Sequence, residues 1–305
     1  MSDSRYAVPF EELGLGDVGL VGGKSAHLGD LLAAGFPVPS GFAVAAHALD
    51  VSSRRAPDSG LPGDAAAAVR AAYAALGDDV PVAVRSSAVA EDAADASFAG
   101  VQDTYLWIRG GDEVVRAVER CWASYFNAEA VTYREHHAGA APGMSVAVQR
   151  MVDARVSGVM FTLNPVSGDP SCIAIEASYG LGVTVVGGEV TPDSFLVSKV
   201  TREILRSDVG EKAVEARADG RYDVDSERRA RLSLEPAEVM QLAELGGAVE
   251  RHYGRAQDIE WSFDDERLWV LQSRDETVWA AKRQPRELAA DPLAAIAATY
   301  LGKRR

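Results

Sequence analysis

The segments Asp258-Ile259-Glu260-Trp261 and Leu271-Gln272-Ser273-Arg274 lie on either side of a polar turn, residues 264–267. Their apolar positions predict a β-hairpin, because strand side chains alternate between faces and polar clusters mark turns. With the turn centred near Glu266, Glu260 lies opposite Gln272 at a Cβ separation of roughly 5 Å. Carboxylate and amide oxygens so placed can share a hard cation such as Mg²⁺, and Arg274 can hold a phosphate beside it.

An acid that faces an arginine on a hairpin is, taken alone, more often a surface cross-strand pair. Three further segments favour a functional site instead: Leu20-Val21-Gly22-Gly23-Lys24-Ser25-Ala26-His27-Leu28-Gly29, Val82-Ala83-Val84-Arg85-Ser86-Ser87-Ala88-Val89-Ala90-Glu91-Asp92 and Ala96-Ser97-Phe98-Ala99-Gly100-Val101-Gln102-Asp103-Thr104-Tyr105. From about Leu13 to Trp279 the chain resembles the N-terminal, ATP-binding domain of phosphoenolpyruvate synthase, pyruvate phosphate dikinase and rifamycin phosphotransferase. The resemblance implies an α+β, two-lobed ATP-grasp fold with mainly antiparallel sheets, in which the nucleotide is held between the lobes.

Size and charge restrict the class of protein. A chain of 305 residues can form one large domain or two lobes with a substantial core. Its 31 basic and 45 acidic residues give a net charge of -14, which argues against nucleic acid or an anionic membrane as the main partner. The two cysteines, Cys121 and Cys172, suggest buried thiols rather than a disulfide framework or a zinc site. No stretch has the length of a signal peptide core or a membrane span, so we expect a cytoplasmic protein.

The order of patterns predicts two lobes and a tail. Residues 1–144 are expected to form the N-terminal lobe, residues 145–281 the C-terminal lobe and residues 282–305 a charged tail. The strand at 145–149 is expected to open the antiparallel sheet of the second lobe. Residues 208–232 are charged and poor in apolar side chains, which predicts a mobile excursion without chemistry.

Two glycine-rich segments partly match known nucleotide-binding motifs, but neither contains the complete motif. Gly23-Lys24-Ser25 ends like a Walker A loop, but Val18 stands where that motif needs glycine. Gly180-Leu181-Gly182 begins like a dinucleotide fingerprint, but its third glycine would fall at Val185. Residues 180–193 match a loop of the resembling family instead, although Val183 stands where many members carry glutamate.

Lys24 and Arg85 are the candidate phosphate ligands of the first lobe. Two glycines before Lys24 let the backbone approach a ligand, and a lysine at a helix start can direct its ammonium at phosphate; a plain helix-entry loop is the alternative. Arg85 ends an apolar strand before two serines, where a guanidinium can bind phosphate bidentately. The resemblance implies that both residues contact the triphosphate.

Three further contacts are implied by the resemblance. Gly100 and Thr104 are carried over as nucleotide contacts, since a loop of small residues before them can wrap phosphates with its N–H groups; a surface turn is the alternative. Gln149 is placed beside the adenine, at the connection between lobes. Without the resemblance it would be an ordinary polar strand residue.

Phosphoryl transfer needs cations that neutralise the charge of the transferred group and an in-line arrangement of donor and acceptor. Lys24, Arg85 and Arg274 are the predicted catalytic cations. Glu260 and Gln272 are the predicted Mg²⁺ ligands on ATP, and Asp258 orients this set or accepts from Arg274. The segment after Arg274 lacks the usual family proline at position 275, a small change beside the site.

The acceptor is expected on another polypeptide. Full-length family members pass the phosphoryl group to a histidine in a glycine-rich stretch, whereas the five histidines of this chain lie in or near helical patterns and are interpreted as structural or solvated: His27, His47, His136, His137 and His252. The ending Glu276-Thr277-Val278-Trp279 is similar to split members of the family such as phenylphosphate synthase, whose ATP-binding subunit is also short. Its start at Met1 and its basic end favour a natural single-domain chain.

The leading hypothesis is a subunit that uses Mg-ATP to phosphorylate a histidine of a separate phosphohistidine-domain protein, with AMP and phosphate as by-products and a small-molecule final acceptor bound elsewhere. Two alternatives stay open: a direct small-molecule kinase that yields ADP, and a non-catalytic ATP-binding regulatory module. The presence of all five of Lys24, Arg85, Glu260, Gln272 and Arg274 counts against the regulatory module.

Overall fold

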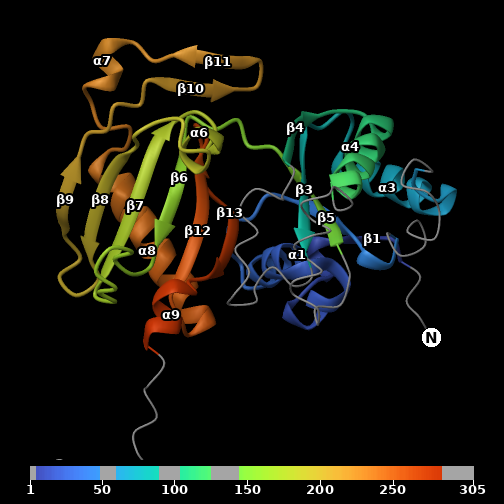
Figure 1. The fold of residues 1–305 in the computed structure, drawn as a ribbon, viewed down its shortest axis with the longest axis horizontal. Coiled ribbons are helices and arrows are strands. Elements are labelled where there is room, and N and C mark those ends of the chain that lie inside the picture. The colour runs from blue at the N-terminus through green and yellow to red at the C-terminus, as the bar shows by residue number, and fades with distance from the viewer. Residues whose placement is uncertain (1–4, 49–59, 89–103, 125–143, 284–305) are drawn as a thin grey trace, which may run out of the picture.

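The computed structural model describes residues 5–48, 60–88, 104–124 and 144–283, which form two large sheets side by side (Figure 1). The first sheet has the strand order β1-β2-β5-β3-β4, and each neighbouring pair is antiparallel. Its strands are β1 (Ala7–Pro9), β2 (Gly41–Val44), β3 (Val82–Ala88), β4 (Thr104–Ile108) and β5 (Met144–Arg150). Two 3-10 turns, Phe10–Glu12 and Leu15–Asp17, lead from β1 into α1 (Val18–Ala33).

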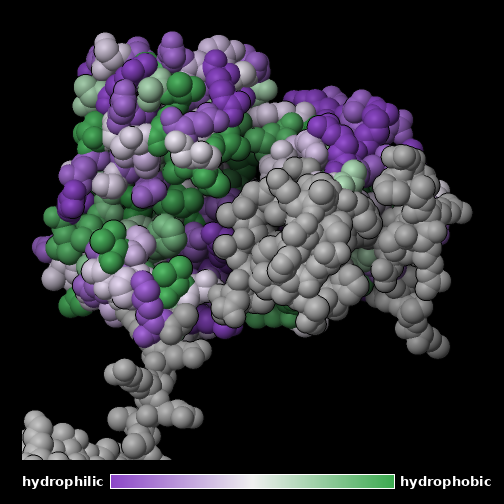
Figure 2. Space-filling view, in the orientation of Figure 1, coloured by the Kyte–Doolittle hydropathy of each residue, from purple (hydrophilic) through white to green (hydrophobic). Residues whose placement is uncertain are grey.

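Helices cover both faces of the first sheet. Alternate strand residues such as Val146 and Val148 pack in one buried cluster with α3 (Gly63–Leu76) and α4 (Gly111–Ser124). Their neighbour Ala147 points the other way, into the cluster that contains α1, as the two-residue period of a strand requires. Figure 2 shows a mainly hydrophilic surface over α4, whereas hydrophobic residues gather over the second sheet.

The second sheet has the order β13-β12-β6-β7-β8-β9 and is also antiparallel throughout. Its strands are β6 (Val156–Phe161), β7 (Cys172–Tyr179), β8 (Asp193–Ser198), β9 (Ile204–Asp208), β12 (Gln257–Phe263) and β13 (Leu268–Asp275). The remaining elements are α6 (Val183–Val186), α7 (Ser226–Arg229), α8 (Pro236–Tyr253), α9 (Val278–Arg283) and the pair β10 (Val214–Arg217) and β11 (Gly220–Asp223). The predicted α+β class with mainly antiparallel sheets is confirmed.

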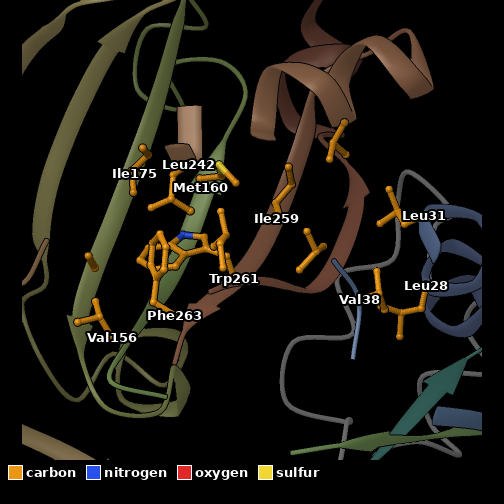
Figure 3. Packing of buried hydrophobic residues seen from close by; sticks show 14 of the residues in the cluster. Leu28, Leu31, Val38, Val156, Met160, Ile175, Leu242, Ile259, Trp261 and Phe263 are labelled. Atoms are coloured by element: carbon orange, nitrogen blue, oxygen red, sulfur yellow. The ribbon is translucent and has the colours of Figure 1, made fainter. Parts of the chain in front are cut away.

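One hydrophobic core joins α1 to the second sheet. Trp261 and Ile259 are fully buried in it, together with Leu28 of α1 and Leu242 of α8. Figure 3 shows Leu28, Leu31 and Val38 on one side of this core and Ile259, Trp261 and Met160 on the other. Helix α1, which precedes most of the first sheet in sequence, therefore packs against both lobes.

The limits of α8 follow from its sequence. It begins at Pro236 and ends at Tyr253. Glu235 and Glu238 form a capping box, Pro236 occupies the first turn, where its missing N–H costs nothing, and Gly254 ends the helix with φ 70°. The cysteines are also as predicted: Cys121 and Cys172 are free and buried.

Two expectations about the second half were wrong. The strand predicted to open the second sheet is β5, which pairs with β2 and β3 as the central strand of the first sheet. Its residues are buried from Met144 to Gln149, because helices cover both of its faces. The chain changes sheet between Arg150 and Val156. The lobe limits 1–144 and 145–281 stay a prediction, and the sheets favour a boundary a few residues later.

The predicted mobile excursion at 208–232 is instead ordered as β10, β11 and α7. Its buried residues include charged side chains as well as the apolar Ala216 and Val224. Lys212 forms an ion pair with Asp193, and both side chains are fully buried. Glu215 accepts two hydrogen bonds from the guanidinium of Arg228, at 2.9 and 3.0 Å.

Candidate active site

The hairpin β12–β13 has the predicted register. Glu260 lies opposite Gln272, and Asp258 lies opposite Arg274. A bulge between Glu260 and Trp261 leaves Leu271 without a partner in the pairing. Such bulges re-aim neighbouring side chains, and here the bulge lies directly beside the Glu260–Gln272 pair.

Glu260 joins the two lobes through an ion pair. Arg85 of β3 donates from Nη2 to Glu260 Oε2 at 2.7 Å, and both side chains are largely buried. Burial raises the pKa of Glu260, but the positive charges of Arg85 and Lys24 lower it by more than burial raises it. The pKa of Glu260 therefore lies below its usual value. The carboxylate is therefore kept ionised where three predicted phosphate ligands converge, since Arg274 also lowers this pKa.

Asp258 accepts hydrogen bonds from Arg274, which is one of the two roles predicted for it. The Nε and Nη2 atoms of Arg274 lie 2.8 and 2.7 Å from Asp258 Oδ2. Burial raises the pKa of Asp258, and Arg274 offsets only part of that shift. Asp258 thereby fixes the direction of the Arg274 side chain along the hairpin.

Lys24 is placed by a break in α1. The helix begins at Val18, earlier than predicted, and is interrupted at Gly22, which has φ 72° and ψ 164°. Lys24 lies just after this break, near the start of the second helical piece, and is buried. Its Nζ donates to the carbonyl oxygen of Ser86 at 2.9 Å, one residue after Arg85.

Replacing Gly22 with alanine is expected to lower the free energy of unfolding by about 1–3 kcal/mol, because a side chain at this φ is strained. A Cβ there would also lie 2.4 Å from Ser87 Oγ and 3.0 Å from Ser87 O. Gly19 in the same helix has no atom within 4 Å of such a Cβ, so Gly19→Ala serves as the matched control. Urea unfolding and ATP titration of the two variants check this; equal stability of both would contradict the role of Gly22.

A cavity of about 320 Å³ lies between the sheets and takes its walls from both. It contains four of the predicted nucleotide contacts, Arg85, Thr104, Gln149 and Glu260. Lys24, Gln272 and Arg274 lie outside its lining, and Gly100 falls outside the described residues. Three charged side chains, Arg85, Arg150 and Glu260, contribute to the lining, and the rest is mostly apolar: Leu106, Met151, Val152, Leu181, Val183, Val186, Trp261 and Leu271.

Gln149 lies in this cavity with a free donor. It is 3 % exposed, and its Nε2 has no hydrogen-bond partner among the described residues. An unpaired buried amide costs free energy unless a ligand or water satisfies it. Its predicted place beside a purine base is compatible with this position and stays a prediction.

The hairpin β10–β11 supports the wall of the cavity, a role that the sequence did not reveal. Leu181 N donates to Ala216 O at 2.9 Å, and Gly180, with φ 72°, forms a bridge with Ala216. Leu181 and Gly182 then lead into α6, whose Val183 and Val186 line the cavity. The sequence signal was the dipeptide Asp219-Gly220, a common hairpin turn.

The residues present fit Mg²⁺. Gln272 Oε1 is buried without a hydrogen-bond partner among the described residues and faces the ionised Glu260 across the hairpin. No group of three or more His, Cys, Asp or Glu side chains that could hold a metal occurs in the described ranges. Magnesium ions are commonly held by one or two protein oxygens together with water and substrate phosphates, so a site of this size suits a nucleotide-bound ion.

Comparison with known families identifies the domain. The family model described as pyruvate phosphate dikinase, AMP/ATP-binding domain, matches residues 54–294. The chain belongs to this family. It is thus an AMP/ATP-binding domain of the dikinase type, and the predicted resemblance to this family is confirmed. The match begins after Lys24, whose assignment rests on its position beside Ser86 and Glu260.

Relatives of this dikinase-type domain are longer proteins. A probable phosphoenolpyruvate synthase of Methanothermobacter thermautotrophicus is 42% identical over 313 residues, covering 88% of this chain and 46% of the relative. A rifampicin phosphotransferase of a Streptomyces species is 38% identical over 311 residues, covering 88% of this chain and 36% of the relative. The chain therefore spans less than half the length of either.

Among solved structures, PH1788 from Pyrococcus horikoshii Ot3 resembles the domain distantly, with a TM-score of 0.40 and 15% identity over 87% of this chain and 94% of that one. So remote a likeness carries no argument about function. Within the described ranges, every helix is too short or too polar to cross a membrane.

Proposed function

We propose that the domain is the ATP-binding part of a phosphotransferase that uses Mg-ATP to phosphorylate a histidine of a separate phosphohistidine-domain protein. The observation that carries the proposal is the cavity between the sheets, where Arg85 of one lobe meets Glu260 of the other. Its lining combines charged side chains with mostly apolar ones. A nucleoside triphosphate likewise combines an anionic chain with a flat base.

The cations of the site are suited to phosphoryl transfer. Lys24, Arg85 and Arg274 would neutralise charge on the phosphates, and fixed charges in a partly buried site need little reorganisation during the reaction. Glu260 and Gln272 would hold Mg²⁺, which would supply further positive charge against the phosphates. The ion pair orients Arg85 and Glu260 before substrate arrives, and the lowered pKa of Glu260 keeps its carboxylate ionised.

The described histidines do not suit the role of acceptor. His27 is buried and bonded to Ser273 O, and His252 lies 2.6 Å from Asp30. His47 is half-buried, and its Nε2 is buried. This supports an acceptor histidine outside the described residues. A small-molecule final acceptor bound elsewhere completes the proposal, since relatives are named phosphoenolpyruvate synthase and rifampicin phosphotransferase.

Chromatography of nucleotide products tests this function. The chain is incubated with Mg-ATP alone and with the phosphohistidine-domain protein encoded nearest to it, and the partner is assayed for acid-labile phosphate. AMP formed only with the labelled partner is the expected result. ADP formed without a partner would support the direct small-molecule kinase, and ATP binding without turnover in any mixture would support the regulatory module.

A further inference from the structure

Helix α1 carries a side chain that contacts the second lobe. His27 lies one helical turn after Lys24, and its Nδ1 is 2.9 Å from the carbonyl oxygen of Ser273. Because a carbonyl oxygen only accepts, Nδ1 carries the proton and donates. The His27 side chain is 8 % exposed, so this hydrogen bond is shielded from water.

The acceptor lies in the middle of the candidate site. Ser273 separates Gln272 from Arg274 on β13, the outermost strand of the second sheet. An outer strand has one row of backbone groups with no strand to pair with. Two groups of that row on β13 bond to the N-terminal part of the chain: Ser273 O accepts from His27, and Val270 N donates to Pro37 O at 2.8 Å.

The ring of His27 is itself held in place. It stacks on Tyr253 of α8, with ring centroids 5.2 Å apart and an interplanar angle of 28°. The Tyr253 hydroxyl donates to the carbonyl oxygen of His27 at 3.5 Å. Ser273 is fixed from its other side as well, because its Oγ donates to Gln257 Oε1 at 2.9 Å.

We propose that His27 is a positioning residue that couples the phosphate-binding helix to the metal-binding strand. Its hydrogen bond to Ser273 holds β13 so that Gln272 presents Oε1 to the ion beside Glu260 while Lys24, on the same helix as His27, holds the phosphates. The inference rests on the proposed function. The inference goes beyond the proposed function because it gives a buried histidine a role. His27 sets the position of the phosphate ligand Lys24 relative to the metal ligands Glu260 and Gln272, which come from the other lobe.

Paired substitutions of His27 test the coupling in the full chain. Asparagine places an amide donor near the position of Nδ1, whereas leucine keeps the bulk and removes the donor. Calorimetry measures ATP affinity in EDTA and in Mg²⁺. We expect the gain in affinity that Mg²⁺ confers to fall by about 10–100-fold in His27→Leu, to be largely retained in His27→Asn, and ATP affinity in EDTA to stay unchanged in both.

A double substitution separates positioning from a general structural role. In a Gln272→Ala background, the strand no longer presents the amide oxygen, so adding His27→Leu is expected to change the Mg²⁺ effect no further. If His27 only supports the fold, His27→Leu will lower the melting temperature and the affinity for ATP in EDTA, with effects additive to those of Gln272→Ala. That result would overturn the inference.

Nitrogen-15 NMR of the unmodified chain gives a readout that does not depend on the folding of a variant. The His27 ring is expected to show a protonated Nδ1 whose resonance shifts with Mg-ATP but not with ATP in EDTA. An unchanged resonance overturns the inference alone. A chain that binds no ATP at all would instead refute the proposed function.

Discussion

Replacing Glu260 with alanine is expected to lower phosphoryl transfer from Mg-ATP by about 10²–10³-fold, because the site loses the only carboxylate of its predicted metal pair. Binding should change with a characteristic sign. The added affinity that Mg²⁺ confers on ATP should vanish. ATP in EDTA should bind as well or better, because the carboxylate that offsets the positive charges of Arg85 and Lys24 is gone. Calorimetry with and without Mg²⁺ measures both effects.

Two controls isolate the role of this carboxylate. Glu260→Gln keeps an acceptor for Arg85, so it tests the charge without removing the partner of a largely buried guanidinium. Glu266→Ala removes an exposed glutamate from the turn of the same hairpin and should leave turnover unchanged. Full turnover in Glu260→Ala, with the expected products, would refute the assignment of Glu260.

The register of the site hairpin could be predicted because local rules determine it. The polar turn fixes which residues face one another, and alternation fixes the face on which each lies. The pairing of Glu260 with Gln272 and of Asp258 with Arg274 was predicted with the turn centred near Glu266. In the structure the turn pairs Phe263 with Leu268, and the bulge between Glu260 and Trp261 produces the predicted register. The bulge beside Glu260 could not be predicted, since no glycine or proline marks it.

Contacts between distant segments were beyond such rules. Arg85 and Glu260 are 175 residues apart, and their ion pair depends on how the two sheets are placed. The strand β5 was assigned to the wrong sheet for a related reason. The apolar pattern of β5 indicates that both faces of the strand are buried, but it does not indicate which strands pair with β5.

Composition misled the prediction at 208–232. Because the segment has few apolar residues, we expected their burial not to offset the conformational entropy lost when the segment becomes ordered. Besides the buried Val224, charged pairs hold it: Lys212 with Asp193 and Arg228 with Glu215. Which residues pair is evident only in the folded chain. The segment matters for function because it supports the loop that leads into α6.

Replacing Asp193 with alanine is expected to lower the free energy of unfolding by about 3–5 kcal/mol, because it leaves a fully buried lysine charge without its partner. Asp193 Oδ1 pairs with Lys212 and accepts from Gly210 N at 2.8 Å, and Oδ2 accepts from Ser233 N and Oγ at 2.6 and 2.7 Å. Urea unfolding measures the loss. Asp219→Ala, at the exposed turn of β10–β11, is the matched control and should cost little.

A second substitution distinguishes a stranded charge from a lost contact. Combining Asp193→Ala with Lys212→Met removes both charges and should recover part of the stability lost in Asp193→Ala; no recovery would show that the hydrogen bonds to Gly210 and Ser233 dominate. The folded fraction of Asp193→Ala should also bind ATP more weakly, because Lys212 and Ala216 lie in the segment that supports Leu181. Glu260→Ala should show the opposite pattern, a large loss of transfer with Mg²⁺-free binding intact, since its side chain acts on the ligand and that of Asp193 acts on the wall that surrounds it.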